Sequence, residues 1–168
     1  MLYELRIKLT SEMLGEQQTH QKIRRFNRPK NLNGNILLDI PYWSWAISEA
    51  CEALSFRDVD GSRIMMDRSL RSPSLQIHVR HWTQTNGRTG KKTRKEEKFE
   101  SIPVGAELSF KLIVSEKPDP SKRADGERSP TEDELFKIFE TLGQLIGVSP
   151  WGSRFGYGRF DVMHVRAV

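Results

Sequence analysis

The stretch MLYELRIKLT, residues 1–10, alternates apolar and charged side chains. Its apolar positions are Tyr3, Leu5, Ile7 and Leu9, and charged residues stand between them. Side chains on a β-strand point alternately to its two faces, so this pattern predicts a strand with one buried and one solvated face. Such a strand is typical of an antiparallel sheet that is covered on one face only.

The stretch PYWSWAISEACEAL, residues 41–54, has a different period. Pro41 suits the first turn of a helix, where its missing N–H would have no partner. Apolar residues then recur every three or four positions, which predicts an amphipathic helix. They are Trp43, Ile47, Ala50, Cys51 and Leu54. The short apolar run NILLDI, residues 35–40, is a candidate strand just before this helix.

Two further stretches alternate as strands do. Residues 75–82, LQIHVRHW, place Leu75, Ile77, Val79 and His81 on one side. Residues 107–114, ELSFKLIV, place Leu108, Phe110, Leu112 and Val114 on one side. We expect both to be half-buried strands of the main sheet.

The last helix and the last strand follow a polar segment. Ser129 is the predicted N-cap, with Pro130 at the first helical position and Glu132 completing a capping box. The buried stripe of this helix comprises Leu135, Ile138, Phe139, Leu142 and Ile146. In the final strand Phe160, Val162, His164 and Arg166 alternate with Asp161, Met163 and Val165.

The major elements therefore run strand, helix, strand, strand, helix, strand. This order predicts an α+β protein, with a single ferredoxin-like, RRM-like βαββαβ domain over residues 1–168. Its antiparallel sheet would be covered on one face by the two helices. Segments 11–34, 84–98 and 115–129 are expected to be flexible or inserted loops, the first two of them basic.

Composition limits the setting. The chain has 168 residues, enough for one domain with a sizeable core. It has 27 Lys and Arg against 22 Asp and Glu, a net charge of +5, which favours an anionic partner such as nucleic acid. Cys51 is the only cysteine, so no intramolecular disulfide can form. Without a signal peptide or a long apolar run, we expect a cytoplasmic protein that does not bind membranes.

The stretch GVSPWGSRFGYGRF, residues 147–160, joins the predicted second helix to the last strand. Its glycines allow positive φ and close approach of another backbone, and free backbone N–H groups can bind an anion. The cations Arg154 and Arg159 stand among the rings of Trp151, Phe155 and Tyr157, on which bases could stack. A helix cap and tight turn, with the rings packed in the core, explain the same composition. Both interpretations stay open.

Residues 152–160, GSRFGYGRF, resemble the glycine-rich loop between the last helix and the last strand of the RAMP superfamily, the RNA-binding proteins of CRISPR systems. Residues 99–114 are similar to the strand that leads into that family's second half. Residues 2–15 resemble its first strand and the loop after it. The resemblance implies a ferredoxin-like fold. It also implies RNA contacts by Gly152, Ser153, Arg154, Gly156, Tyr157, Gly158 and Arg159.

Two basic segments extend this expectation. Residues 20–30 contain no acid and five cations, namely Lys22, Arg24, Arg25, Arg28 and Lys30. They follow the first strand, where the family places insertions that contact RNA, and phosphate contacts would make binding salt-dependent. In residues 87–98 we expect Lys91, Lys92 and Arg94 to belong to a finger that reaches nucleic acid or a neighbouring subunit. A solvated loop and a hairpin without any partner are the respective alternatives.

The sequence offers little for catalysis. Its four histidines show no metal-binding spacing and it has one cysteine, so we expect neither a metal nor a cofactor. Some RAMP endoribonucleases use a histidine as general acid and base without a metal. His20, beside the basic residues, is the candidate for that role here, although an enzyme is not the favoured interpretation.

We therefore expect a RAMP-like protein that binds single-stranded RNA and acts within or against a CRISPR ribonucleoprotein of antiviral defence. Other CRISPR-type subunits or copies of itself are further candidate partners. One alternative is a metal-independent endoribonuclease that processes guide RNA. Another is a protein-interaction module, such as a virus-encoded mimic of a CRISPR subunit.

Overall fold

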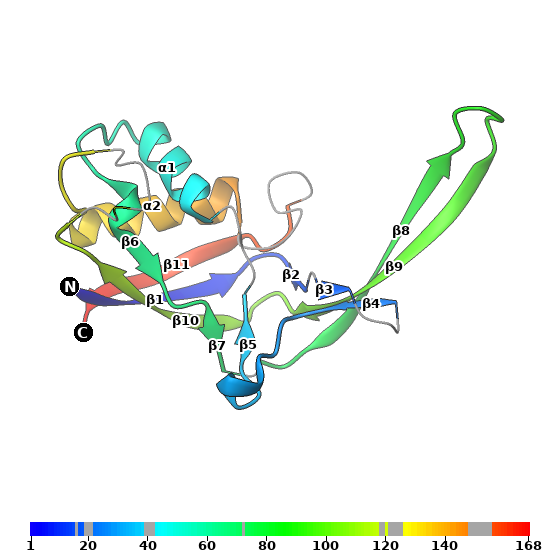
Figure 1. The fold of residues 1–168 in the computed structure, drawn as a ribbon, viewed down its shortest axis with the longest axis horizontal. Helices are drawn as coiled ribbons and strands as arrows, with labels where there is room; N and C mark the ends of the chain where they lie inside the picture. Colours follow the sequence, from blue (N-terminus) through cyan, green and yellow to red (C-terminus); the bar gives the residue numbers. More distant parts are fainter. Residues whose placement is uncertain are drawn as a thin grey trace.

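The computed structural model describes residues 1–15, 17–18, 22–38, 43–71, 73–117, 120, 126–147 and 156–168. Its helical elements are η1 (Lys30–Leu32), α1 (Trp43–Ala53), η2 (Gly61–Arg63) and α2 (Glu132–Leu145). Its strands are β1 (Leu2–Leu9), β2 (Met13–Leu14), β3 (Gln17–Gln18), β4 (Ile23–Arg25), β5 (Ile36–Leu37), β6 (Ile64–Met66), β7 (Ser69–Leu70), β8 (Gln76–Thr85), β9 (Lys92–Ile102), β10 (Glu107–Val114) and β11 (Phe160–Ala167). The protein is thus of the mixed α+β class with mostly antiparallel sheets (Figure 1).

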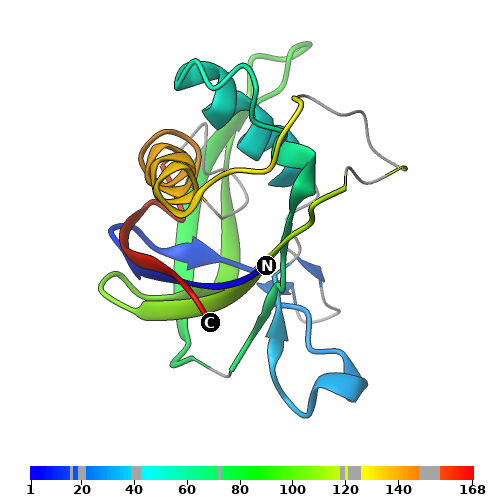
Figure 2. The same ribbon diagram turned by 90° about the vertical axis from the view of Figure 1, so that its left-hand side faces the viewer.

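The main sheet has the strand order β11-β1-β10-β6, and every neighbouring pair in it is antiparallel. Helices α1 and α2 cover one face of this sheet (Figure 2). Side chains on its other face, such as Arg6 and Lys8, are exposed. The alternation predicted for residues 1–10 is confirmed, because Leu5, Ile7 and Leu9 are buried while Arg6 and Lys8 are exposed. The same holds for β10, whose Leu108, Phe110, Leu112 and Val114 lie in the core.

Helix α2 packs its apolar stripe onto this sheet. Leu135, Ile138, Phe139 and Leu142 are completely buried, as their spacing predicted. A Cβ atom on Gly143 would lie 2.3 Å from the Phe160 carbonyl oxygen, so the absence of a side chain there lets the helix approach β11. Pro41, which was expected to begin the first helix, lies outside the described residues.

The start of α2 differs from the prediction. Its N-cap is Thr131 and not Ser129, and the capping box joins Thr131 to Glu134. Ser129 instead donates its hydroxyl to the Ser115 carbonyl, because the helical backbone begins only at Glu132. Arg128 donates two hydrogen bonds to the Glu134 carboxylate, which lowers the pKa of Glu134 from 4.5 to about 2.

The predicted strand at residues 75–82 is a strand, but it does not belong to the main sheet. That position is taken by the short strand β6, which pairs with β10. Strand β8 instead pairs with β9 over ten residue pairs, from Gln76↔Ser101 to Thr85↔Lys92. Its apolar positions are therefore not buried, and Ile77 and Val79 remain 52% and 41% exposed. An alternating sequence predicts that a strand has one apolar and one polar face, but it does not predict which element covers the apolar face.

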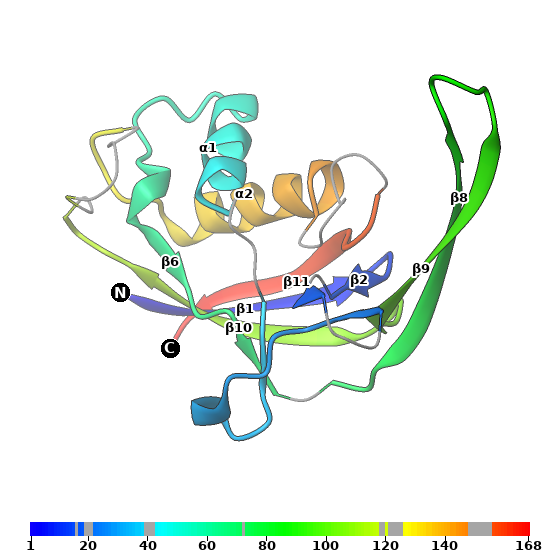
Figure 3. The ribbon, with the colours of Figure 1, turned by 45° about the vertical axis from the view of Figure 1, so that its right-hand side comes forward.

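Strands β8 and β9 form a long arm that projects from the end of the molecule opposite the two termini (Figure 1). The expected loop 84–98 is for the most part this arm, and only residues 86–91 form its tip. The expected loop 11–34 also differs from the prediction, because it contains β2, β3, β4 and η1. In the expected loop 115–129, the described residues 115–117, 120 and 126–129 belong to no helix or strand. Seen from a second direction, the arm rises on the same side of the main sheet as the helices (Figure 3).

The last strand contains a bulge. Arg6 pairs with His164 and Ile7 with Val162, so Met163 has no partner in β1. The extra residue turns Val165 toward the core, where it is buried together with Phe160. The uninterrupted alternation predicted for residues 160–166 is therefore wrong beyond Val162.

Candidate nucleic-acid interface

The tip of the arm is closed by local sequence. The Asn86 side chain accepts hydrogen bonds from the backbone N–H groups of Arg88 and Thr89, at 2.9 and 3.2 Å. Gly90 has a φ of 66° and donates its N–H to the Asn86 carbonyl. An Asx turn followed by a glycine in the left-handed region is a common way to reverse a two-stranded ribbon. The ten-residue strand β8 makes this ribbon roughly 30 Å long.

The outer part of the arm is positively charged. Between Trp82 and Lys95 the sequence has five cations and no carboxylate, and every residue in this range is exposed. The cations are Arg88, Lys91, Lys92, Arg94 and Lys95. None of the five has an ion-pair partner among the described residues, whereas Lys98 and His81, nearer the base, each approach Glu96. The outer part of the arm thus includes Lys91, Lys92 and Arg94, the residues that the sequence predicted to lie on a finger.

The two faces of the arm differ. Residues paired across an antiparallel ribbon point to the same side, so the register assigns each side chain to a face. One face carries Arg80, Trp82, Gln84, Thr93, Lys95 and Glu97, and continues inward to His78 and Phe99. The other carries Ile77, Val79, His81, Thr83, Glu96, Lys98 and Arg94. We call the first the tryptophan face.

The tryptophan face meets the end of the glycine-rich stretch at the base of the arm. The His78 ring packs edge-on against Tyr157, with ring centroids 5.4 Å apart, and also lies near the completely buried Phe99. His78 Nε2 lies 3.0 Å from Tyr157 Oη, and His78 Nδ1 lies 3.1 Å from Glu12 Oε2. Ser101 Oγ donates to the same Glu12 oxygen at 2.6 Å. These four residues form a polar chain that joins β9, β8, the segment after β1 and the segment before β11.

The glycine-rich stretch is described from Gly156 onward, where it is fastened to the segment after β1. Ser11 Oγ donates to the Gly156 carbonyl at 2.6 Å and accepts the Arg159 N–H at 2.7 Å. Gly158 donates its N–H to the Glu12 carbonyl. Gly156 and Gly158 have φ values of 76° and 67°, so both need the freedom of glycine. The predicted site residues Gly152, Ser153 and Arg154, like Trp151 and Phe155, lie outside the described residues.

Arg159, the last of the predicted loop residues, has a hydrogen-bond partner within the protein. The Arg159 guanidinium donates to the Gln144 carbonyl near the end of α2. A cation at that position satisfies a carbonyl that the helix leaves without an internal partner. Arg159 thus has a structural role beside the predicted contact with RNA.

The basic segment 20–30 is largely held against β9. The Arg28 guanidinium donates to both carboxylate oxygens of Glu100, at 2.8 and 2.6 Å, and this bond raises the pKa of Arg28. Glu100 is only 5% exposed and also accepts the Phe26 N–H, while Arg25 lies 3.6 Å from it. Arg24 approaches Glu97 at 3.5 Å and lies over the Phe99 ring.

The five cations predicted to contact RNA in this segment fall into two groups, those with a carboxylate partner in the protein and those without one in its described part. Arg24, Arg25 and Arg28 have carboxylate partners on β9, so much of their charge is already neutralised within the protein. Lys22 and Lys30 are exposed and have no ion-pair partner in the described part of the chain. His20, the candidate acid–base residue, lies outside the described residues.

The sequence alone did not indicate Trp82 as a site residue, nor the chain of Glu12, His78 and Tyr157. Glu12 and Tyr157 stand at opposite ends of the sequence, and no local pattern connects either to His78. Trp82 was visible as the end of an alternating run, but its position opposite Lys95 depends on the register of the arm.

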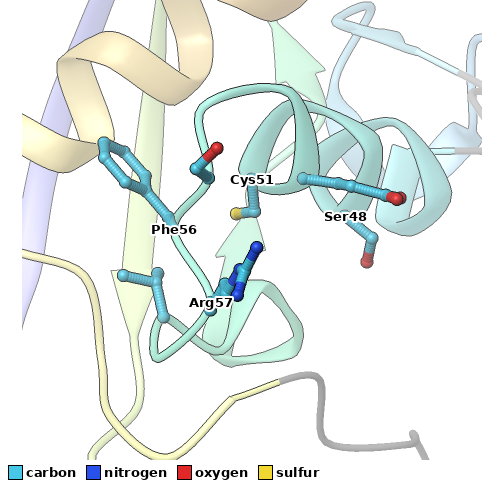
Figure 4. A pocket seen from close by; sticks show the side chains of 7 residues that line it. Ser48, Cys51, Phe56 and Arg57 are labelled. Carbon is cyan, nitrogen blue, oxygen red and sulfur yellow. The ribbon is translucent and has the colours of Figure 1, made fainter.

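A pocket of about 560 Å³ lies away from the arm, beside the C-terminal half of α1. Cys51, Phe56 and Arg57 contribute to its lining (Figure 4). Its described lining contains one cation, Arg57, and one carboxylate, Glu52, so the charges of these residues do not match a polyanion.

Among the described residues, no cluster of three His, Cys, Asp or Glu side chains could hold a metal ion. No described helix is both long and apolar enough to cross a membrane. Comparison with models of known protein families and with curated proteins found no match for this chain.

Proposed function

We propose that the protein binds single-stranded RNA along the β8–β9 arm and the adjoining glycine-rich stretch. The observation that carries this proposal is the group of five cations on the outer arm, exposed and without ion-pair partners in the described structure. A phosphate backbone supplies, at regular spacing, the counter-charges that the described residues do not supply. The glycine-rich stretch meets the arm through the contact between His78 and Tyr157.

The arrangement of the main sheet supports a RAMP-like relationship as part of this proposal. Strand β10 lies between β1 and β6, and strand β1 lies between β10 and β11. The two strands that each helix connects, β1 and β6 through α1 and β10 and β11 through α2, therefore have one strand between them, as in a ferredoxin-like split βαβ unit. In this proposal the arm, strands β2 to β5 and strand β7 are additions to that unit. The protein would act within or against a CRISPR ribonucleoprotein.

The proposal predicts that charge on the arm controls affinity. We expect the triple variant Lys91→Glu, Lys92→Glu, Arg94→Glu to bind a labelled 20-nucleotide single-stranded RNA at least about tenfold more weakly at 0.1 M salt. The slope of log K against log salt should become shallower by roughly 2, since about 0.7 is lost per phosphate contact on a single strand. Fluorescence anisotropy over a salt series measures both quantities.

A matched control separates the arm from net charge. The variant Arg57→Glu, Lys117→Glu, Lys137→Glu changes the charge of the protein by the same amount at positions outside the arm. We expect it to keep most of the wild-type affinity. Equal weakening in both triple variants would contradict the arm as the RNA site. Absence of RNA binding by the wild-type protein, together with a tight protein partner, would favour the protein-interaction module instead.

A metal-independent endoribonuclease is the second candidate, and the chain of Glu12, His78 and Tyr157 favours it. In such cleavage the RNA 2′-oxygen bonds to phosphorus and the bond to the 5′-oxygen breaks. One group takes the 2′-hydroxyl proton and another protonates the leaving oxygen. A histidine between a carboxylate and a phenol has the right groups for these transfers.

We nevertheless expect RNA to stay intact. Both ring nitrogens of His78 are occupied, one by Glu12 and one by Tyr157, and the side chain is only 22% exposed. The test is incubation with structured and unstructured RNA in EDTA, followed by gel analysis, using wild type, His78→Ala and His20→Ala. Specific cuts that persist in EDTA and disappear in either histidine variant would establish the enzyme and contradict this expectation.

A further inference from the structure

Trp82 is exposed on the arm at a place where the fold does not need an indole ring. It is 39% exposed and does not belong to the hydrophobic core. The residues beside it on the tryptophan face are polar or charged, namely Arg80, Gln84, Thr93, Lys95 and Glu97. Tryptophan is enriched at binding interfaces, because its ring offers a large apolar surface together with a polar N–H.

The surroundings of Trp82 fit one kind of occupant. Lys95 stands directly opposite it on β9, within side-chain reach, and has no ion-pair partner in the described structure. From Trp82 to the tip the arm carries no carboxylate. An aromatic ring beside a free ammonium group can hold a nucleotide by stacking on the base and contacting the adjacent phosphate.

The face that carries Trp82 is also the face that leads to the glycine-rich stretch. His78, two positions inward along the same side of β8, packs against Tyr157. A strand that lies on Trp82 and continues inward therefore approaches Tyr157 and Gly158. This continuity connects the arm to the second predicted RNA-binding segment.

We propose that Trp82 stacks on an unpaired base of a bound RNA strand, with Lys95 at the neighbouring phosphate. The inference rests on the proposed function and specifies it, because only a strand with exposed base faces can stack. Duplex RNA would bind through charge alone and gain nothing from Trp82. Stacking does not read the sequence, since every base has a π-face.

The test uses three probes of equal length: 12-nucleotide oligouridine, an abasic 12-nucleotide ribose-phosphate chain, and a 12-base-pair RNA duplex. We expect Trp82→Leu to weaken binding of oligouridine by about 5- to 100-fold. Its affinity for the abasic chain and the duplex should be unchanged. Trp82→Phe should retain most of the affinity for oligouridine. Trp45→Leu is the matched control, because Trp45 is also exposed but lies on α1, and it should bind as wild type does.

The outcomes distinguish this inference from the function on which it rests. If Trp82→Leu binds oligouridine normally while the triple arm variant binds weakly, RNA binding stands and the stacking role is overturned. Equal losses on oligouridine and on the abasic chain would overturn it too. If circular dichroism shows that Trp82→Leu does not fold, the comparison of oligouridine with the abasic chain on the wild-type protein tests stacking instead. Equal affinity of the wild type for oligouridine and the abasic chain excludes stacking. If the wild type binds none of the probes, the proposed function falls.

Discussion

Replacing Asp60 by alanine is expected to lower the free energy of unfolding by about 3–5 kcal/mol. The Asp60 side chain is completely buried and accepts hydrogen bonds from the N–H and hydroxyl of Ser62 and from Arg63 Nε. Arg63 is only 11% exposed and also donates to the carbonyls of Glu116 and Glu127. Without Asp60 a nearly buried guanidinium loses its counter-charge. Urea unfolding followed by circular dichroism measures the change.

An exposed ion pair provides the control. Arg6 Nη2 lies 2.6 Å from Glu107 Oε2, but the two side chains are 44% and 40% exposed. Because water already solvates both groups, Arg6→Ala should cost less than about 1 kcal/mol. A loss below about 1 kcal/mol in Asp60→Ala as well would show that the burial of Asp60 does not have the expected consequence.

Replacing Arg28 by alanine is the second large effect, with an expected loss of about 2–3 kcal/mol in the free energy of unfolding. The substitution removes two short charge-assisted hydrogen bonds from the buried carboxylate of Glu100. The Phe26 N–H and the more distant Arg25 remain, so the loss is smaller than at Asp60. Lys30→Ala, in the same segment, should change stability by less than about 0.5 kcal/mol. Equal stability of the two variants in urea would contradict the structural role of Arg28.

This second prediction affects how RNA binding should be tested. Reversing Arg24, Arg25 and Arg28 to glutamate is the experiment that the basic segment suggests from sequence. In the structure it would place new carboxylates beside Glu97 and Glu100, at the base of the arm. Any loss of RNA affinity in that variant would then report partial unfolding. The cations of the outer arm avoid this problem, since none of the five is paired within the described structure.

Local periodicity was enough to predict most elements of the main layer, although it assigned residues 75–82 to the place that β6 holds in the sheet. The alternation at Leu5, Ile7 and Leu9 and the helical spacing at Leu135, Ile138 and Leu142 both ended in the buried core. In each case the period follows from the geometry of one element, and one apolar face must be covered. The mixed α+β class follows from the order of those elements.

The sequence could not predict the exact N-cap of α2 or the bulge in β11. Ser129 and Thr131 are both good capping residues, and contacts with residues that precede the helix decide between them. The Ser129 hydroxyl donates to the Ser115 carbonyl, and Arg128 donates to the Glu134 carboxylate that completes the capping box with Thr131. No local pattern predicts the bulge at Met163 either, because it arises from the pairing of β11 with β1.

The sequence by itself determined which residues have apolar faces and where positive charge accumulates. Tertiary structure alone decided what each of those faces meets. It left Ile77 and Val79 exposed on an arm, paired Arg28 with Glu100 across 72 residues of sequence, and brought Glu12, His78 and Tyr157 together. A period of two or 3.6 residues is set by the local backbone, whereas partners distant in sequence are set by strand register and by the path of the whole chain.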